Sequence, residues 1–120
     1  MAIEAARTAY ENRAEDIIIL DLTGIAQFCD YFVICNGNSR RQVQGIAKSV
    51  EKQLRESDVS QLGHEGWDQA NWILLDFGGL LVHLFMPDTR QYYDFDLVWG
   101  DAKKVEWKEK EEPADEQNIS

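Results

Sequence analysis

The chain has little of what metal-binding, secreted or membrane-spanning proteins need. It has 120 residues, with two cysteines, two histidines and two prolines. Cys29 and Cys35 lack zinc-site spacing and lie in apolar stretches, which indicates small buried side chains in a reducing compartment. Apolar runs such as Ile17–Leu20 are far shorter than the roughly 20 residues of a membrane span. The first residues also lack a signal-peptide pattern, so we expect a cytoplasmic protein.

Basic side chains are scarce as well. Lysine and arginine number 12 against 22 aspartates and glutamates, which leaves a net charge of −10. Residues 1–100 alone carry 8 basic and 15 acidic side chains, so the acidity is not confined to one end. Nucleic-acid binding normally requires a basic face, and we therefore expect no direct nucleic-acid contact. A negative charge of this size allows long-range attraction to a basic protein. The alternative interpretation is that the charge only keeps the protein soluble.

Three segments have the apolar spacing of amphipathic helices. The first covers residues 2–13 and the third covers residues 89–99. The second follows Gly37-Asn38-Ser39, where the serine is a typical helix cap. The apolar residues of this second helix repeat with helical spacing and predict one buried stripe: Val43, Ile46, Ala47, Val50 and Leu54.

Four apolar segments and one short polar segment predict strands. They cover residues 16–22, 30–36, 61–65, 72–77 and 80–86. We expect the first to be buried on both faces and the third to be a short edge strand. Gly78-Gly79 between the last two predicts a two-residue hairpin. The order of these elements predicts an α/β protein: a mixed β-sheet with flanking helices.

The apolar pattern stops near Asp101, where charges begin to alternate. We therefore expect one folded domain over residues 1–101 and a charged, disordered tail over residues 102–120. Truncation after Asp101 is then expected to leave folding and partner binding nearly unchanged.

An enzyme is the main alternative that the motifs leave open. Gly37-x-Ser39 at a helix start imitates one element of the nucleotidyltransferases, but the carboxylate pair that should follow on the next strand is absent. Asp94-Phe95-Asp96 lies far downstream, without basic residues to hold phosphates. The pair His64 and His83 lacks metal-site spacing, which favours a structural His83 that hydrogen-bonds across the sheet. We expect no catalytic site, no metal and no cofactor.

Aromatic and acidic side chains gather between residues 72 and 99. Side chains alternate along a strand, so Trp72 and Asp76 share one face, and a fully buried face does not favour an aspartate. Core packing accounts for several of these aromatics. A partly exposed face of tryptophan, tyrosine and aspartate instead fits a protein–protein interface, with a basic protein or with a second copy of the chain.

A set of motifs in this order resembles the Iojap family of ribosomal silencing factors. The match runs from about Ala2 to Asp101, and its specificity comes from the ordered set rather than from any one motif. The matching segments are Asp30-Tyr31-Phe32-Val33-Ile34, Gly37-Asn38-Ser39, Glu65-Gly66, Trp72-Ile73-Leu74-Leu75-Asp76-Phe77-Gly78, Val82-His83-Leu84-Phe85, Arg90 and Tyr93-Asp94-Phe95-Asp96-Leu97-Val98-Trp99.

The resemblance implies a fold related to the nucleotidyltransferases that lacks their active site. It implies binding to the large ribosomal subunit through the basic ribosomal protein L-fourteen. That contact blocks joining of the small subunit and so represses translation. By position, it makes Trp72, Phe77 and Tyr93 the expected partner-binding residues, with Asp76 and Asp94 as charge partners.

Overall fold

Six strands form one mixed sheet in the computed structural model, which describes residues 1–94 and 98–108. Their order is β3-β4-β5-β2-β1-β6. In chain order they are β1 (Glu15–Asp21), β2 (Tyr31–Asn36), β3 (Gly63–Glu65), β4 (Trp72–Asp76), β5 (Leu80–Phe85) and β6 (Lys103–Lys104). Central β2 and β5 are parallel, whereas the other neighbours are antiparallel. The predicted mixed sheet, with β3 at one edge, is confirmed.

Burial follows the position of each strand. Central β2 is buried along nearly its whole length, as expected of a strand covered on both faces. The expectation for β1 is wrong at its beginning, because Glu15 and Asp16 are exposed and a register shift separates Glu15 from Ile18. β6 pairs with Leu20 and Asp21 in the second half of β1, and burial is greatest in that half.

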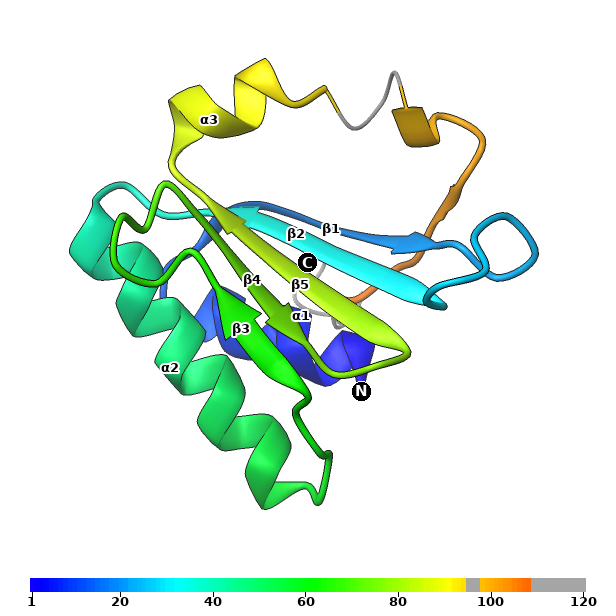
Figure 1. Ribbon diagram of the computed structural model, residues 1–120, viewed down its shortest axis with the longest axis horizontal. Helices are drawn as coiled ribbons and strands as arrows, with labels where there is room; N and C mark the ends of the chain where they lie inside the picture. The colour runs from blue at the N-terminus through cyan, green and yellow to red at the C-terminus, as the bar shows by residue number, and fades with distance from the viewer. Residues whose placement is uncertain (95–97, 109–120) are drawn as a thin grey trace, which may run out of the picture.

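Two long helices, α1 (Ala2–Glu11) and α2 (Arg40–Glu56), cover one face of the sheet (Figure 1). The Ser39 hydroxyl caps α2 by accepting a hydrogen bond from the Gln42 N–H, 3.1 Å away. The buried residues of α2 are the five predicted ones: Val43, Ile46, Ala47, Val50 and Leu54. Among the described residues, no helix has the length and apolar character to cross a membrane.

The β4–β5 hairpin has the predicted two-residue turn. The Phe77 N–H donates to the Leu80 carbonyl at 2.9 Å, which leaves Gly78 and Gly79 at the tip. Gly78 has φ +85°, a conformation that favours glycine. Asp76 Oδ1 accepts from the Gly78 N–H at 2.9 Å and so tightens the turn.

The third helix is shorter than predicted. α3 covers Pro87–Tyr92, with the proline in its first turn, and Tyr93 already has an extended backbone. α3 thus ends well before Trp99, although Val98 and Trp99 are again helical, and residues 95–97 of the predicted helix lie outside the described residues. α3 lies over the face of the sheet opposite α1 and α2 (Figure 1).

Residues 102–108 differ from the expected disordered tail. β6 pairs with the end of β1, and the Val105 N–H donates to the Ile19 carbonyl at 3.0 Å. Trp107 is only 9% exposed, and its indole N–H donates to the Ile17 carbonyl at 3.2 Å. This segment satisfies backbone groups that an uncovered edge strand would leave open. The expected boundary at residue 101 is therefore wrong for residues 102–108; residues 109–120 lie outside the described part.

The sheet separates two apolar clusters. The helix-side cluster contains the buried faces of α1 and α2 together with Trp107 and Phe77. The opposite cluster is smaller and consists of Leu20, Leu22, Cys29, Phe32, Ile34 and Phe85. Cys29 and Cys35 are free and buried, as predicted, and burial raises the pKa of Cys35 to about 12. The smaller cluster supports the candidate site.

Candidate partner-binding surface

The face of β4 that points away from the helices begins the candidate site. Ile73 and Leu75 are fully buried and pack in the helix-side cluster. Trp72, Leu74 and Asp76 alternate with them and remain only partly buried. The predicted alternation of side chains along β4 is confirmed. It leaves Trp72 only partly buried on the face of the sheet opposite α1 and α2.

Trp72 lies at the centre of an aromatic group. Its ring centroid is 4.6 Å from Tyr93 and 5.1 Å from Phe85, its cross-strand partner in β5. Tyr93 directly follows α3 and is 42% exposed, and Tyr92 packs edge-on against it while remaining 82% exposed. The end of α3 thus brings two tyrosines over the start of β4.

An open pocket of about 200 Å³ lies beside these rings. Its lining residues are Trp72, Tyr93, Asp94, Val98 and Trp99. The structure therefore brings together three of the five predicted partner-binding residues, namely Trp72, Tyr93 and Asp94. An apolar pocket with one carboxylate at its wall suits an apolar or cationic side chain of a partner.

The other two predicted residues lie elsewhere. Asp76 is at the far end of β4, about 13 Å from Trp72 at the usual rise per strand residue, and holds the hairpin turn. Phe77 is 6% exposed and packs in the helix-side cluster. The period of two that placed Asp76 beside Trp72 also places Phe77 on the opposite face, so the sequence contained the signal for this separation.

The exposed apolar surface extends beyond the predicted residues. Phe28, in the loop between β1 and β2, is 60% exposed, and its ring lies 6.1 Å from Trp99. Ile25 in the same loop and Val98 are also exposed. Phe28 and Ile25 were not among the predicted residues, although two large apolar residues in a loop between strands were the available signal.

Beneath Trp72, a buried histidine supports the surface. The Trp72 indole N–H donates to His83 Nδ1 at 3.1 Å, and His83 is 5% exposed. The predicted structural histidine, hydrogen-bonded across the sheet, is confirmed. Burial lowers the pKa of His83 from 6.5 to about 3, so the ring is neutral at physiological pH.

The buried neutral His83 is expected to make the protein less stable in mild acid. The unfolded chain takes up the proton below pH 6.5 and the folded chain resists it until about pH 3, so stability is complete above pH 6.5 and falls below it. The slope approaches about 1.4 kcal/mol per pH unit. Urea unfolding at pH 7.5, 6.0 and 5.2 measures it. All three pH values stay above the range in which Glu4 titrates. Hydrogen bonds from Ser57 and Gln53 lower the pKa of this carboxyl.

Two variants assign this acid dependence. His83→Leu should lose most of the decline between pH 6.5 and 5.2, whereas His64→Gln should keep it. An unchanged decline in His83→Leu would contradict the assignment to His83.

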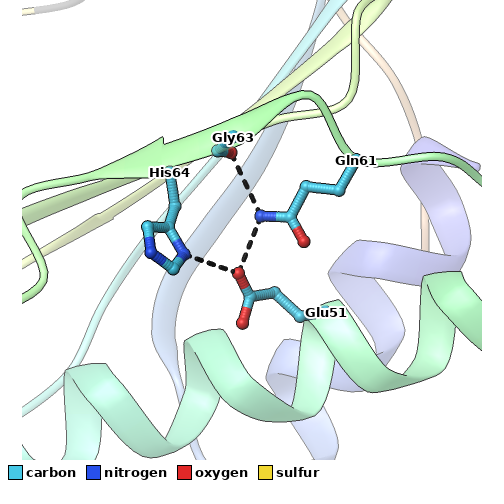
Figure 2. Close-up of polar contacts among 4 residues, drawn as sticks. All are labelled: Glu51, Gln61, Gly63 and His64. Atoms are coloured by element: carbon cyan, nitrogen blue, oxygen red, sulfur yellow. Dashed lines mark hydrogen bonds and ion pairs between the residues drawn. The ribbon is translucent and has the colours of Figure 1, made fainter.

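The second histidine lies on the other face of the sheet. His64 pairs with Leu75 in β4, and its Nδ1 is 3.0 Å from Glu51 Oε2 on α2. Figure 2 shows that Gln61 joins the same carboxylate, at 2.7 Å, and also the Gly63 carbonyl. These contacts fasten the edge strand to α2. Because His83 faces the opposite cluster, the two imidazoles cannot share one metal ion.

Potential metal ligands are also scattered elsewhere. Within residues 1–94 and 98–108, no three histidine, cysteine, aspartate or glutamate side chains gather as metal ligands would. Asp94 faces the pocket beside Trp72, and Asp96 lies outside the described residues.

The turn before α2 is a helix cap in which backbone N–H groups already donate hydrogen bonds to side chains. The Asn38 N–H donates to Gln42 Oε1 at 2.5 Å, while the Gln42 N–H donates to Ser39 Oγ. A phosphate at this position would have to displace both contacts. The geometry therefore favours a cap over a nucleotide site.

Comparisons with known proteins agree on one family. A family model described as "Ribosomal silencing factor during starvation", RsfS, matches residues 1–120. The ribosomal silencing factor RsfS of Bacillus subtilis is 46% identical over 98 residues, which are 82% of this chain and 83% of that protein.

A solved structure and a more distant relative extend the comparison. The crystal structure of a Chromobacterium violaceum protein is 32% identical, with a TM-score of 0.78, over 89% of this chain and 88% of the other. A mouse protein is named for mitochondrial assembly of the ribosomal large subunit. It is 29% identical over 74% of this chain and 40% of its own length.

Proposed function

The chain belongs to the RsfS family of ribosomal silencing factors, and on this premise we propose that it represses translation by binding the large ribosomal subunit. The bound chain would occupy a surface that the small subunit needs, so that the two subunits do not join. The name of the mouse relative supports the choice of the large subunit. The site of action is then the cytoplasm, with its ribosomes.

The observation that carries the proposal is the exposed aromatic surface around Trp72. Trp72 and Tyr93 offer ring faces at an open pocket, and Asp94 adds a carboxylate to its wall. Tryptophan and tyrosine are the residues that most often anchor protein interfaces. Phe77 has no place on this surface because it is buried, and Asp76 serves at most as a distant charge partner.

We propose a basic ribosomal protein, L-fourteen, as the direct partner. The net charge of −10 favours long-range attraction to a basic protein and opposes direct contact with ribosomal RNA. A second copy of the chain would bury the same aromatic rings, so a homodimer would compete with the ribosome for them.

Sedimentation with isolated subunits tests the proposal. The protein should pellet with large subunits through a sucrose cushion and should remain in the supernatant with small subunits. Raising the salt concentration should weaken the contact, because salt screens the attraction between opposite charges. Pelleting with small subunits only, or with neither subunit, would contradict the proposal.

We further propose that the chain has a fold related to that of the nucleotidyltransferases and that it is not an enzyme. The occupied N–H groups of Asn38 and Gln42 and the missing carboxylate pair support this view. No nucleoside triphosphate should bind at micromolar concentration in the presence of magnesium, as measured by isothermal titration calorimetry. A clear binding isotherm would favour the alternative, a nucleotidyltransferase-like or metal-dependent enzyme.

A further inference from the structure

The contact between Trp72 and His83 is a diagonal pair across two antiparallel strands. Trp72 lies opposite Phe85 in β5, and His83 lies opposite Leu74 in β4. The side chains of Trp72 and His83 therefore share one face of the sheet, displaced by two residues along the strands. The Trp72 indole N–H donates to His83 Nδ1 at 3.1 Å. The indole N–H only donates, so His83 accepts at Nδ1 and its neutral ring carries the proton on Nε2.

Packing fixes the orientation of the imidazole. The Phe32 ring meets it edge-on at 4.5 Å, and the Phe85 ring lies parallel to it at 6.1 Å. His83 is 5% exposed, so rotation of its ring would displace buried neighbours. The acceptor atom is therefore held in one place beneath Trp72.

A fixed acceptor in turn orients the indole. The polar edge of Trp72 points down to His83, while its ring packs against Phe85 and Tyr93 and lines the open pocket. Without the acceptor, the indole N–H would lose its partner within an aromatic cluster, which is costly. The ring would then gain by turning its N–H toward water, and the pocket wall would change.

We propose that His83 is a positioning residue of the partner-binding surface, which holds the Trp72 ring in its binding orientation through the indole hydrogen bond. The proposal has two arms. The binding arm, that this orientation strengthens partner binding, rests on the proposed function. The orientation arm, that His83 orients Trp72, concerns the free protein alone, so the two arms can fail separately.

Indole N–H signals in the free protein test the orientation arm. The chain has four tryptophans, so a ¹⁵N-labelled sample should show four indole signals. The Trp72 signal, assigned as the one lost in Trp72→Phe, should exchange slowly with solvent. Exchange should speed up at least 10-fold in His83→Leu and recover in part in His83→Gln, whose side-chain oxygen can accept. Fast exchange in the unmodified protein, or unchanged exchange in His83→Leu, would overturn the proposal.

Large-subunit binding tests the consequence. His83→Leu and Trp72→Phe each remove one end of the hydrogen bond, and each should weaken binding about 10-fold. The double variant should lose little more than either single one, because both changes remove the same contact. Additive losses, or wild-type binding by a folded His83→Leu protein, would overturn the proposal.

Controls separate this inference from the proposed function. His64→Gln changes the histidine on the other face of the sheet, where His64 stacks on Trp67, and should leave both the Trp72 signal and binding unchanged. If His83→Leu does not fold, His83→Gln and Trp72→Phe carry the test, and wild-type binding by Trp72→Phe would overturn the proposal. If the unmodified protein binds no large subunits, the proposed function fails, and the exchange rates still decide whether His83 orients Trp72.

Discussion

Replacing Trp72 by alanine is expected to weaken binding to the large ribosomal subunit by about 30-fold or more. An aromatic anchor at the centre of an interface typically contributes 2 kcal/mol or more, roughly 30-fold in affinity. Trp72 is only partly buried in the free chain, so the cost to folding should be smaller than the about 3–5 kcal/mol of a buried tryptophan. Binding measured by sedimentation, together with the melting temperature, separates the two effects.

Trp67→Ala provides the matched control for Trp72→Ala. Trp67 is also partly buried, but it packs against the helix-side cluster and stacks on His64. Its removal should leave binding by the folded protein within about twofold, a difference of less than 0.5 kcal/mol. Equal binding losses in the two variants, or a large fall in melting temperature with Trp72→Ala, would contradict the role of Trp72 as an exposed anchor.

Replacing Trp107 by alanine is expected to cost about 3–5 kcal/mol of folding free energy. Trp107 fills a place in the helix-side cluster, and its indole N–H binds the Ile17 carbonyl. Its own carbonyl accepts from Arg7 Nε on α1 at 3.0 Å, so the residue joins α1, β1 and the C-terminal segment. A domain of this size has about 5–15 kcal/mol of stability in total, so the urea midpoint should fall markedly.

A graded variant makes the Trp107 test specific. Trp107→Phe keeps most of the ring but removes the indole donor, so it should cost less than the alanine, with about 1 kcal/mol coming from the hydrogen bond. Truncation after Asp101 removes both the tryptophan and β6 and should cost at least as much as Trp107→Ala. A truncated protein with an unchanged urea midpoint would instead support the disordered tail that the sequence alone suggested.

Regular elements were predictable because each has a local signal. The five buried residues of α2 follow the helical period, and Ser39 marks the start of that helix. Gly78-Gly79 between two apolar runs specified the hairpin. Such patterns depend on neighbours in sequence, so they survive without knowledge of the tertiary structure.

Long-range contacts were not predictable in the same way. Trp107 stands among charged residues in the sequence, and its partners come from β1 and α1, 90 or more positions earlier in the chain. At the early end of α3, Tyr93 has an extended backbone and its ring packs against Trp72, a residue about 20 positions earlier in the chain. Phe77 is the exception, because the alternation along β4 already placed it away from Trp72. For the candidate site, the sequence therefore identified the aromatic anchors Trp72 and Tyr93, but it did not identify the neighbouring exposed apolar residues Phe28 and Ile25.

Subunit joining tests the central claim most directly. Purified small and large subunits are mixed at a magnesium concentration that favours the joined ribosome, with and without the protein, and separated on a sucrose gradient. Prior incubation of the large subunits with the protein should reduce the joined peak, and Trp72→Ala should restore that peak while Trp67→Ala should not. An undiminished joined peak in the presence of large subunits saturated with the protein would contradict the account.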